Sequence, residues 1–507
     1  MNKAKTLGEL KKSGYVSKSI KQELRDNLIK KIQAKENPFP CILGYEDSVI
    51  PDTERAILSQ HNILFLGLRG QAKTRMARLM TDLLDEYIPV IEGSEINDDP
   101  LNPISRYAVD LIQEKGAATP ISWMHRSERY GEKLATPDVS VADLIGDIDP
   151  IKAANLKLNF ADERVLHYGI IPRSNRSIFV INELPDLQAR IQVSLFNILE
   201  EGDLQIRGFK LRLPLDVMFV FTANPEDYTN RGSIVTPLKD RIESQILTHY
   251  PKAIETSLEI TEQEAKISDA QLQKVKVSDL IKRLIEQVAF EARGSELVDK
   301  KSGVSARLTI SAYENAISAA ERRAIINNEK ETQVWLSDLV GIIPSITGKI
   351  ELVYEGEQEG PFQVAYNLLE RSIRTQFAQY FPNPDSLKKK RGGKETGQED
   401  NPYKSITRWF DAGNTLNTFF ETKDDDKMQL LYKVDGLHAL VKKYFKGGSE
   451  KEHALLMEFV LHGLAAHSLI SKKVVEGKIE FKDLMGSMLN IGSQHFSEED
   501  FNEEDFN

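Results

Sequence analysis

A lysine–threonine pair follows a glycine-containing turn in the first half of the chain. The segment Gly67–Thr74 reads GLRGQAKT and comes directly after the apolar stretch Asn62–Leu66. Apolar residues then recur on one face of a predicted helix over Met76–Leu83. Glycines let backbone N–H groups surround an anion, and the start of a helix adds partial positive charge. A lysine here reaches the β- and γ-phosphates of a nucleotide, and a threonine hydroxyl reaches Mg²⁺, so the segment is predicted to bind ATP.

One residue departs from the usual pattern of such loops, in which a glycine precedes the lysine. Ala72 takes that place, and its β-carbon is small enough that we expect the loop to close. An ordinary glycine turn that leads into a helix is the alternative interpretation. The predicted ATP-binding residues of the loop are Gly67, Leu68, Arg69, Gly70, Gln71, Ala72, Lys73 and Thr74.

A second polar pair ends the apolar stretch Ser177–Glu183. A nucleotide hydrolase needs an oxygen beside Mg²⁺ and a carboxylate that polarises the attacking water. Glu183 suits the second role, and Asn182 is predicted at the Mg²⁺ together with Thr74. Asn182 stands where an aspartate is usual, so it offers an amide oxygen without a negative charge. The alternative is a strand that ends in a surface Asn–Glu pair.

The elements that must position these residues can be read from apolar patterns. Ile63–Leu66, Ile178–Ile181 and Val217–Thr222 are short apolar runs separated by helical stretches. Buried parallel strands read in this way, which predicts an α/β fold with a parallel sheet. From Thr256 to about Ser345, and again over residues 403–492, the pattern predicts helices.

The order of these motifs resembles that of the AAA+ ATPases, and specifically the MoxR and magnesium-chelatase I-subunit group. The resemblance covers about residues 38–345. Gly67–Thr74 is similar to the family's Walker A loop, and Ile178–Glu183 is similar to its Walker B strand apart from Asn182. Three further segments are similar to the sensor 1, arginine-finger and sensor 2 motifs: Phe219–Pro225, Pro237–Arg241 and Gly303–Arg307.

This resemblance implies roles for individual residues. Asn224 is expected near the γ-phosphate, and Arg307 is expected to contact the nucleotide from a helical lid. Arg241 is the candidate arginine finger, with Arg231 as its competitor. Glu183, Arg241 and Asn224 are therefore the expected catalytic residues.

Less specific similarities support the same family. Asp143–Pro150 and Tyr168–Pro172 resemble family segments that precede Walker B. Leu204–Pro214 alternates apolar and polar residues around a glycine, which predicts a hairpin where the family has one before sensor 1.

The resemblance also implies assembly and activity. An arginine that acts on a neighbouring subunit implies a homo-oligomeric ring, expected to be a hexamer, with ATP and Mg²⁺ bound between subunits. The expected function is ATP hydrolysis that remodels or activates a client protein, as in a MoxR-like chaperone. The alternatives are a magnesium-chelatase-like ATPase subunit, a sigma-factor-interacting transcriptional regulator and a non-hydrolysing nucleotide-gated scaffold. A client with a metal-ion-binding von Willebrand-type domain would favour the chaperone or the chelatase.

Six segments are expected along the chain. They are an N-terminal helical segment (1–37), an AAA+ α/β nucleotide-binding core (38–255), a helical lid (256–345), a connecting region and linker (346–402), a helical C-terminal region (403–495) and an acidic tail (496–507). The tail repeats EEDFN, and a docking segment and a solubilising tail are both consistent with it.

Composition and charge argue against several classes of protein. The net charge of −11 argues against a broad nucleic-acid surface, and the basic run Lys388–Arg391 is interpreted as part of the linker. Cys41 is the only cysteine, so no internal disulfide forms. No signal-peptide or transmembrane pattern is found, so no membrane partner is expected and the predicted location is the cytoplasm. His453, His462 and His467 do not share a helix face and are interpreted as surface or packing residues.

Overall fold

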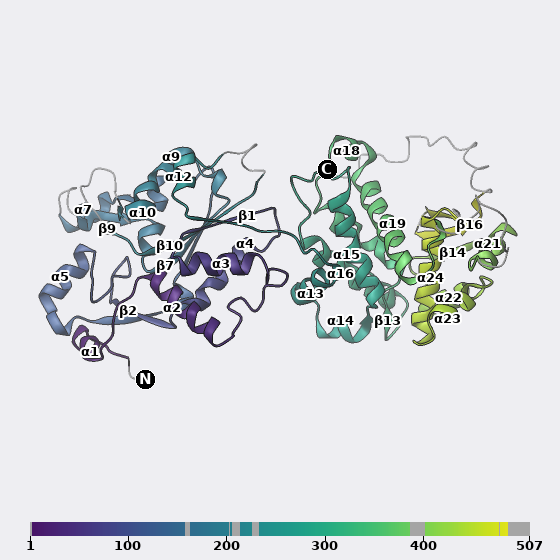
Figure 1. Cartoon of the computed structure of the whole chain (residues 1–507), viewed down its shortest axis with the longest axis horizontal. Coiled ribbons are helices and arrows are strands. Elements are labelled where there is room, and N and C mark those ends of the chain that lie inside the picture. Colours follow the sequence, from purple (N-terminus) through teal and green to yellow (C-terminus); the bar gives the residue numbers. More distant parts are fainter. Residues whose placement is uncertain are drawn as a thin grey trace. The chain divides into compact units, whose positions relative to one another are not determined.

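The computed structural model describes residues 3–157, 163–201, 203–204, 213–225, 233–385, 401–475 and 477–484. The chain divides into two compact units, Met1–Pro251 (unit 1) and Lys252–Asn507 (unit 2) (Figure 1). Each unit has its own secondary structure and its own buried core.

A five-stranded parallel sheet forms the centre of unit 1. Its strands lie in the order β11 (Ser244–Leu247), β1 (Ile63–Leu66), β10 (Val217–Ala223), β7 (Ser177–Asn182) and β4 (Tyr130–Leu134). The three strands expected from the sequence are the three central ones. The predicted α/β fold with a parallel sheet, followed by a mostly helical region, is confirmed.

Alternate residues of the central strands face two separate cores. Ile63 and Phe65 of β1 pack in one core, and Leu64 between them packs in the other. Successive side chains of a strand point to opposite faces, so a sheet covered on both faces needs apolar residues at every position. This requirement explains why β1, β7 and β10 are continuous apolar runs.

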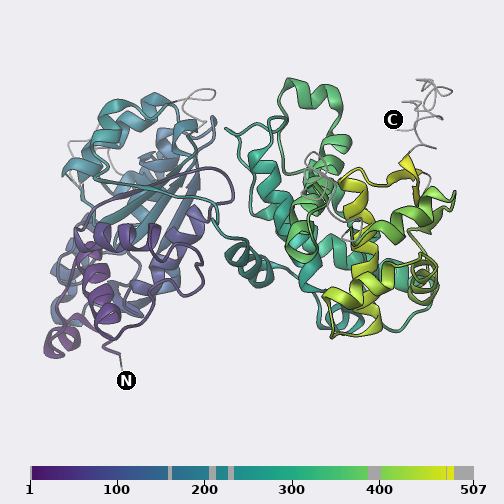
Figure 2. The ribbon, with the colours of Figure 1, turned by 45° about the vertical axis from the view of Figure 1, so that its right-hand side comes forward.

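Helices cover both faces of the sheet. Those from the start of the chain (purple) lie on one face, and those that follow β7 (teal) lie on the other (Figure 2). The helices of unit 1 are α1 Leu7–Lys12, α2 Ile20–Gln33, α3 Val49–Leu58, α4 Lys73–Leu79, α5 Arg106–Lys115, α6 Val141–Leu144, α7 Pro150–Leu156, α8 Ile170–Arg173, α9 Ala189–Ser194, α10 Phe196–Glu201 and α12 Thr236–Asp240.

A buried ion pair joins α2, near the start of the chain, to the rest of unit 1. Glu23 accepts two hydrogen bonds from Arg129, at 2.6 and 2.7 Å. Arg129 is 1% exposed and Glu23 is 4% exposed, so the two charges satisfy each other inside the core.

Three short antiparallel strand pairs complete unit 1. They are β2 (Tyr87–Ile91) with β3 (Ile121–His125), β5 (Gly146–Ile148) with β6 (Leu166–Tyr168), and β8 (Asp203–Leu204) with β9 (Leu213–Pro214). The last pair forms the two ends of the predicted hairpin. Residues 205–212 between them lie outside the described residues.

Unit 2 is built from helices around one large core. These are α13 Ile254–Glu264, α14 Asp269–Lys274, α15 Asp279–Gly294, α16 Arg307–Ile326, α17 Ile343–Thr347, α18 Tyr354–Glu359, α19 Pro361–Tyr380, α21 Lys404–Asp411, α22 Asp424–Tyr432, α23 Leu437–Tyr444 and α24 Glu450–Ala466. A two-stranded parallel pair, β12 (Val275–Lys276) with β13 (Thr332–Gln333), lies among them. The core extends from α15 to the C-terminal strands, and Trp335 is fully buried in it.

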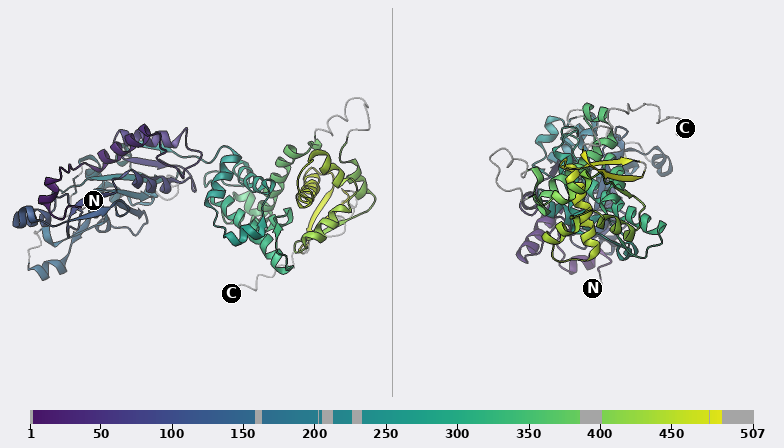
Figure 3. Two further views of the ribbon diagram at one scale, coloured as in Figure 1. Left: turned by 90° about the horizontal axis from the view of Figure 1, so that it is seen from below. Right: turned by 90° about the vertical axis from the view of Figure 1, so that its right-hand side faces the viewer.

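The C-terminal region is not entirely helical, which corrects the expectation for residues 403–492. A three-stranded antiparallel sheet joins β14 (Leu416–Phe419), β16 (Lys478–Lys482) and β15 (Ser471–Val475). Its strands lie beside α24, and Ile479 and Phe481 pack into the same core as that helix (Figure 3). Residues 386–400 of the predicted connecting region and linker, and the whole EEDFN tail, lie outside the described residues. Among the described helices, none combines the length and apolarity that a membrane span requires.

Candidate functional site

Three neighbouring strand ends bring the predicted polar residues to one edge of the sheet. In the parallel register, Leu66 of β1 lies beside Ala223 of β10, and β10 in turn lies beside β7. The chain therefore leaves the sheet at adjacent points on entering Gly67 and Asn224, while Asn182 ends β7. Residues far apart in the sequence become neighbours because all three strands run in the same direction.

The loop Gly67–Thr74 closes tightly at its first glycine. A β-carbon on Gly67 would overlap Thr248 Oγ1 and Gln71 Oε1. Gly70 and Ala72 both have left-handed backbone conformations, with φ of 71° and 55°. Glycine adopts this conformation readily, whereas an alanine does so at a cost of roughly 1–2 kcal/mol. The loop thus closes as predicted, and Ala72 bears the strain that a glycine would avoid.

Residues after β11 and before α3 hold the loop backbone from outside. The Tyr45 hydroxyl donates to Gln71 O at 2.8 Å, and the Tyr250 hydroxyl donates to Arg69 O at 2.8 Å. The Thr248 hydroxyl donates to Gln71 Oε1 at 2.7 Å. The sequence analysis missed these residues because they lie far from the loop in sequence and form no motif of their own.

Lys73 lies at the centre of the loop and is 7% exposed. Its ammonium group donates to Gly67 O, to Leu68 O at 3.0 Å and to Asn224 Oδ1 at 3.4 Å. These oxygen atoms belong to two backbone carbonyls and one amide. Phosphate oxygens can take the place of these neutral hydrogen-bond partners.

Thr74 and Asn182 meet across the gap between α4 and β7. The Thr74 hydroxyl donates to Asn182 Oδ1 at 3.1 Å, and the Thr222 hydroxyl of β10 donates to the same oxygen at 3.1 Å. Glu183 follows with a left-handed φ of 53°, and its N–H donates to Thr222 Oγ1 at 3.2 Å. Backbone strain at a polar residue is common at functional sites.

A carboxylate that the sequence analysis missed also touches this group. Asn182 Nδ2 donates to Glu132 Oε1 at 2.6 Å. Arg78 and the Tyr130 hydroxyl donate to Glu132 Oε2, at 2.8 and 2.9 Å. Burial, together with the Glu132 carboxylate, raises the pKa of Tyr130, which keeps its hydroxyl a neutral donor. Glu132 lies on the edge strand β4, whose mixed sequence YGEKL gave no strand signal.

The arginines expected from the resemblance lie after α12 and at the start of α16. Arg241 follows α12 and pairs with Glu200 of α10, with Nε–Oε2 at 2.8 Å and Nη2–Oε2 at 2.6 Å. No hydrogen bond or ion pair among the described residues joins it to the loop. Arg307 is exposed at the start of α16, in unit 2. Arg231 lies outside the described residues.

The three histidines of the C-terminal region are packing residues. His453, His462 and His467 are 9%, 3% and 4% exposed, which settles between the two interpretations left open. Within the described ranges, no group of three or more His, Cys, Asp or Glu side chains is arranged to hold a metal ion.

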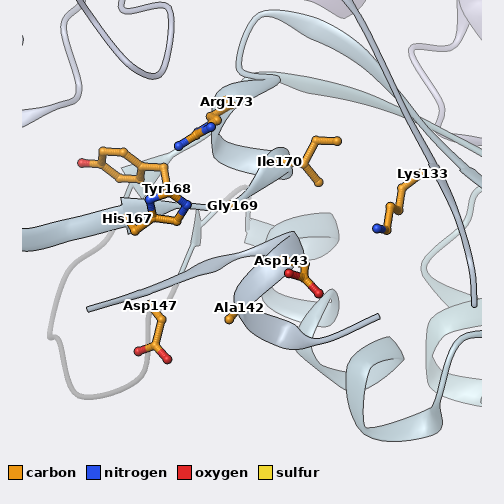
Figure 4. Close-up of a pocket in the computed structure, with 9 residues that line it drawn as sticks. All are labelled: Lys133, Ala142, Asp143, Asp147, His167, Tyr168, Gly169, Ile170 and Arg173. Carbon is orange, nitrogen blue, oxygen red and sulfur yellow. The ribbon is translucent and has the colours of Figure 1, made fainter. Parts of the chain in front are cut away.

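A separate cavity of about 380 Å³ lies in unit 1 between α6, β5, β6 and α8 (Figure 4). The two segments around Asp143 and Tyr168, which the sequence analysis singled out, both line it. Lys133, Asp147 and Arg173 add charges of both signs. Because the cavity lining carries charges of both signs, it gives no preference for an anion.

The loop and the strand ends fit a Mg²⁺-bound nucleotide. Lys73 and a glycine-containing loop suit phosphate, and the Thr74 hydroxyl and the Asn182 amide provide the oxygen ligands that Mg²⁺ prefers. Glu183 adds a carboxylate at the next residue.

No protein-family model and no curated protein sequence matches the chain. Among solved structures, a Cytophaga hutchinsonii protein proposed to be an ATPase aligns at 18% identity over 71% of this chain and 97% of that chain, with a TM-score of 0.29. The BchI–BchD complex of magnesium chelatase aligns at 18% identity over 63% and 98%, with a TM-score of 0.33. NtrX from Brucella abortus in complex with ATP aligns at 14% identity over 72% and 69%, with a TM-score of 0.36.

With TM-scores below 0.5, these likenesses carry no argument about fold or function. The assignment of function depends on the geometry of the site itself.

Proposed function

We propose that this chain is an AAA+ ATPase of the MoxR and magnesium-chelatase type, which binds ATP with Mg²⁺ at Gly67–Thr74 and hydrolyses it to remodel or activate a client protein. The observation that carries the proposal is that two hydrogen-bonded pairs, Lys73–Asn224 and Thr74–Asn182, lie at three adjacent strand ends. A glycine turn with a merely structural role would not require these four polar side chains to converge.

Each residue of the group has a role in this account. Lys73 exchanges its carbonyl partners for phosphate oxygens, and the backbone of Gly67–Ala72 surrounds them. Thr74 and Asn182 hold Mg²⁺, which neutralises charge on the phosphates when it is bound. Glu183 orients and polarises the attacking water, and Asn224 positions the terminal phosphate through its contact with Lys73.

Arg241 acts on the neighbouring subunit of a ring in this proposal. In the single chain it is 27% exposed and paired with the half-exposed Glu200. Surface pairs of this kind contribute about 0–1 kcal/mol, so a nucleotide on the next subunit competes easily for the arginine. Arg307, on the proposed lid (256–345), contacts the same nucleotide after the lid closes.

Phosphate release by the full chain at saturating ATP and Mg²⁺ tests the proposal. The wild type releases phosphate slowly, and Glu183→Gln lowers the rate at least about 100-fold while ATP binding is retained. Glu128→Gln, an exposed glutamate of the same unit, serves as the matched control and leaves the rate unchanged. If the wild type binds ATP without releasing phosphate, the chain is a non-hydrolysing nucleotide-gated scaffold instead.

Mixing of two inactive variants tests the ring. Each proposed active site combines Glu183 of one subunit with Arg241 of its neighbour. Mixed subunits of Glu183→Gln and Arg241→Ala therefore regain activity, because some interfaces contain both wild-type residues. If the mixture stays as inactive as its components, Arg241 does not act between subunits.

The client protein is identified separately, by its capture on the Glu183→Gln variant in the presence of ATP.

A further inference from the structure

The Mg²⁺ side of the proposed site lacks charge if only the end of β7 is considered. Carboxylates are the usual protein ligands of Mg²⁺, whereas Asn182 is a neutral amide. A carboxylate nevertheless touches this amide, because Glu132 Oε1 lies 2.6 Å from Asn182 Nδ2. It comes from the adjacent strand β4, whose Leu134 lies beside Asn182 in the register.

The direction of this hydrogen bond fixes the orientation of the amide. A carboxylate only accepts hydrogen bonds, so the amide nitrogen of Asn182 must face Glu132. The amide oxygen then faces the hydroxyl groups of Thr74 and Thr222, which both donate to it. Glu132 thereby determines that Asn182 presents an oxygen toward Thr74, as a metal ligand must.

The Glu132 carboxylate is held in place by two further donors. Its second oxygen accepts from Arg78 and from the Tyr130 hydroxyl. Arg78 lies on α4, the helix that begins with Lys73 and Thr74. The Arg78 side chain is 65% exposed and that of Glu132 is 28% exposed, so this ion pair contributes little to stability. Its effect is to tie the carboxylate to the helix of the phosphate loop.

We propose that Glu132 is a positioning residue for Mg²⁺-dependent nucleotide binding, and that it supplies through Asn182 the negative charge that an aspartate would otherwise bring to the end of β7. The carboxylate lies on the neighbouring strand β4 instead of β7, and it acts on the Mg²⁺ site through the amide of Asn182. This inference rests on the proposed function, since it requires Mg²⁺ beside Thr74. Partners behind a metal ligand commonly change metal affinity by about 10–100-fold.

Exchange of the two residue types tests the inference. In the double variant Glu132→Gln with Asn182→Asp, the carboxylate lies on β7 and the amide lies on β4. Every hydrogen bond is kept, because the glutamine nitrogen donates to the new carboxylate and its oxygen accepts from Arg78 and Tyr130. The two single variants carry either no carboxylate or two adjacent ones. Glu128→Gln, on the same segment but exposed, controls for net charge.

The measurement is equilibrium binding of a fluorescent ATP analogue to the full chain, in excess Mg²⁺ and in EDTA. Glu132→Gln is expected to lose about tenfold of the Mg²⁺-dependent affinity with its affinity in EDTA unchanged. Asn182→Asp alone brings no gain, because two like charges then lie in contact. The double variant returns to within about threefold of the wild type, well inside the tenfold loss of the single variant.

The outcomes separate this inference from the proposed function. Wild-type affinity that rises with Mg²⁺, together with an unchanged Glu132→Gln variant, overturns the inference alone. A double variant that stays as weak as Glu132→Gln also overturns it, provided that its unfolding midpoint equals that of the wild type. If the double variant is unstable, Glu132→Asp is measured instead. Aspartate keeps the negative charge but is one methylene shorter. An affinity of Glu132→Asp equal to that of Glu132→Gln overturns the inference. A wild type that binds no nucleotide overturns the proposed function itself.

Discussion

Each unit of the chain buries a cation among polar side chains, and the two are held in different ways. In unit 1, Lys73 donates to two backbone carbonyls and to an amide oxygen. In unit 2, Arg323 is 2% exposed and donates to two carboxylates. The described partners of Lys73 are neutral oxygens, whereas those of Arg323 include two carboxylates.

The buried Arg323 of unit 2 and the hydrogen-bond acceptors around it form an arginine cluster. Asp338 accepts from both Nε and Nη2 of Arg323, at 3.1 and 3.0 Å, and Asp424 accepts from Nη1 at 2.7 Å. Thr332 and the carbonyl of Gln333 accept from Nη2. Although burial opposes the charge, the two carboxylates raise the pKa of Arg323. Each nitrogen of the guanidinium has a hydrogen-bond partner, so the cluster stabilises the fold.

The largest effect expected from this difference is on the stability of unit 2. Arg323→Met leaves the buried Asp338 carboxylate without its cation and leaves Asp424 paired only with Lys451. The loss costs about 3–5 kcal/mol of folding free energy. Denaturant unfolding, followed by tryptophan fluorescence in a Trp123→Phe background, reports on unit 2 because the remaining tryptophans, Trp335 and Trp409, lie there.

The adjacent arginine provides a matched control. Arg322 is 69% exposed and pairs with Glu421 at 2.8 Å. Arg322→Met is therefore expected to change the free energy of unfolding by less than about 1 kcal/mol. ATP affinity stays the same in both variants while unit 2 is folded, because neither arginine belongs to the proposed nucleotide site. A loss of affinity in Arg323→Met at a denaturant concentration where unit 2 remains folded would contradict the division of roles.

A smaller effect concerns pH. Burial lowers the pKa of His462 well below its ordinary value, and Lys472 and Lys427 lower it further. Above a pH of about 6.5 the imidazole is neutral in both folded and unfolded chains. As the pH falls below this value, only the unfolded chain takes up the proton, so unit 2 loses up to about 1.4 kcal/mol per pH unit.

His462→Asn removes this titration and keeps an acceptor for Lys472, which donates to His462 Nδ1 in the wild type. The slope of unfolding free energy against pH, between about 6.5 and 5, should fall for this variant. His167→Asn, at an exposed position of unit 1, should leave that slope unchanged. Equal slopes for His462→Asn and wild type would show that the imidazole does not govern the acid sensitivity of unit 2.

The smallest effect concerns the strained alanine of the loop. Ala72→Gly relieves a left-handed conformation and is expected to stabilise unit 1 by about 0.5–1 kcal/mol without loss of ATP affinity. Ala77→Gly, five residues later inside α4, should instead destabilise it by about 1 kcal/mol. Thermal unfolding of both variants decides this, and destabilisation by Ala72→Gly would mean that the β-carbon is needed for packing.

Sequence patterns predicted the centre of unit 1 well, for a physical reason. β1, β7 and β10 are covered on both faces, so each is a continuous apolar run that ends where polar residues begin. The edge strands β4 and β11 are mixed in polarity because solvent reaches them, and they were missed. Glu132 was missed with β4, although it touches the predicted Asn182.

Other features depend on contacts that no local pattern encodes. The pairing of Arg241 with Glu200 joins the residue after α12 to α10, and the hydrogen bond from Tyr250 to Arg69 joins the end of unit 1 to the loop after β1. The C-terminal sheet was missed because its strands are short and lie next to long helices, although Lys478–Lys482 alternates polar and apolar residues. Local periodicity finds elements, whereas their partners depend on the whole fold.

Equilibrium titration of the full chain with ATP and Mg²⁺, compared between the wild type and Lys73→Met, tests the central claim most directly. Methionine keeps most of the buried volume of Lys73 and removes its charge, so the fold should persist. Lys115→Met, at an exposed position of α5, controls for the loss of one cation. The account predicts that the wild type and Lys115→Met bind ATP alike and that Lys73→Met loses at least about tenfold in affinity, the cost of a charged contact to phosphate. Equal binding by all three proteins would show that Gly67–Thr74 is not the phosphate site.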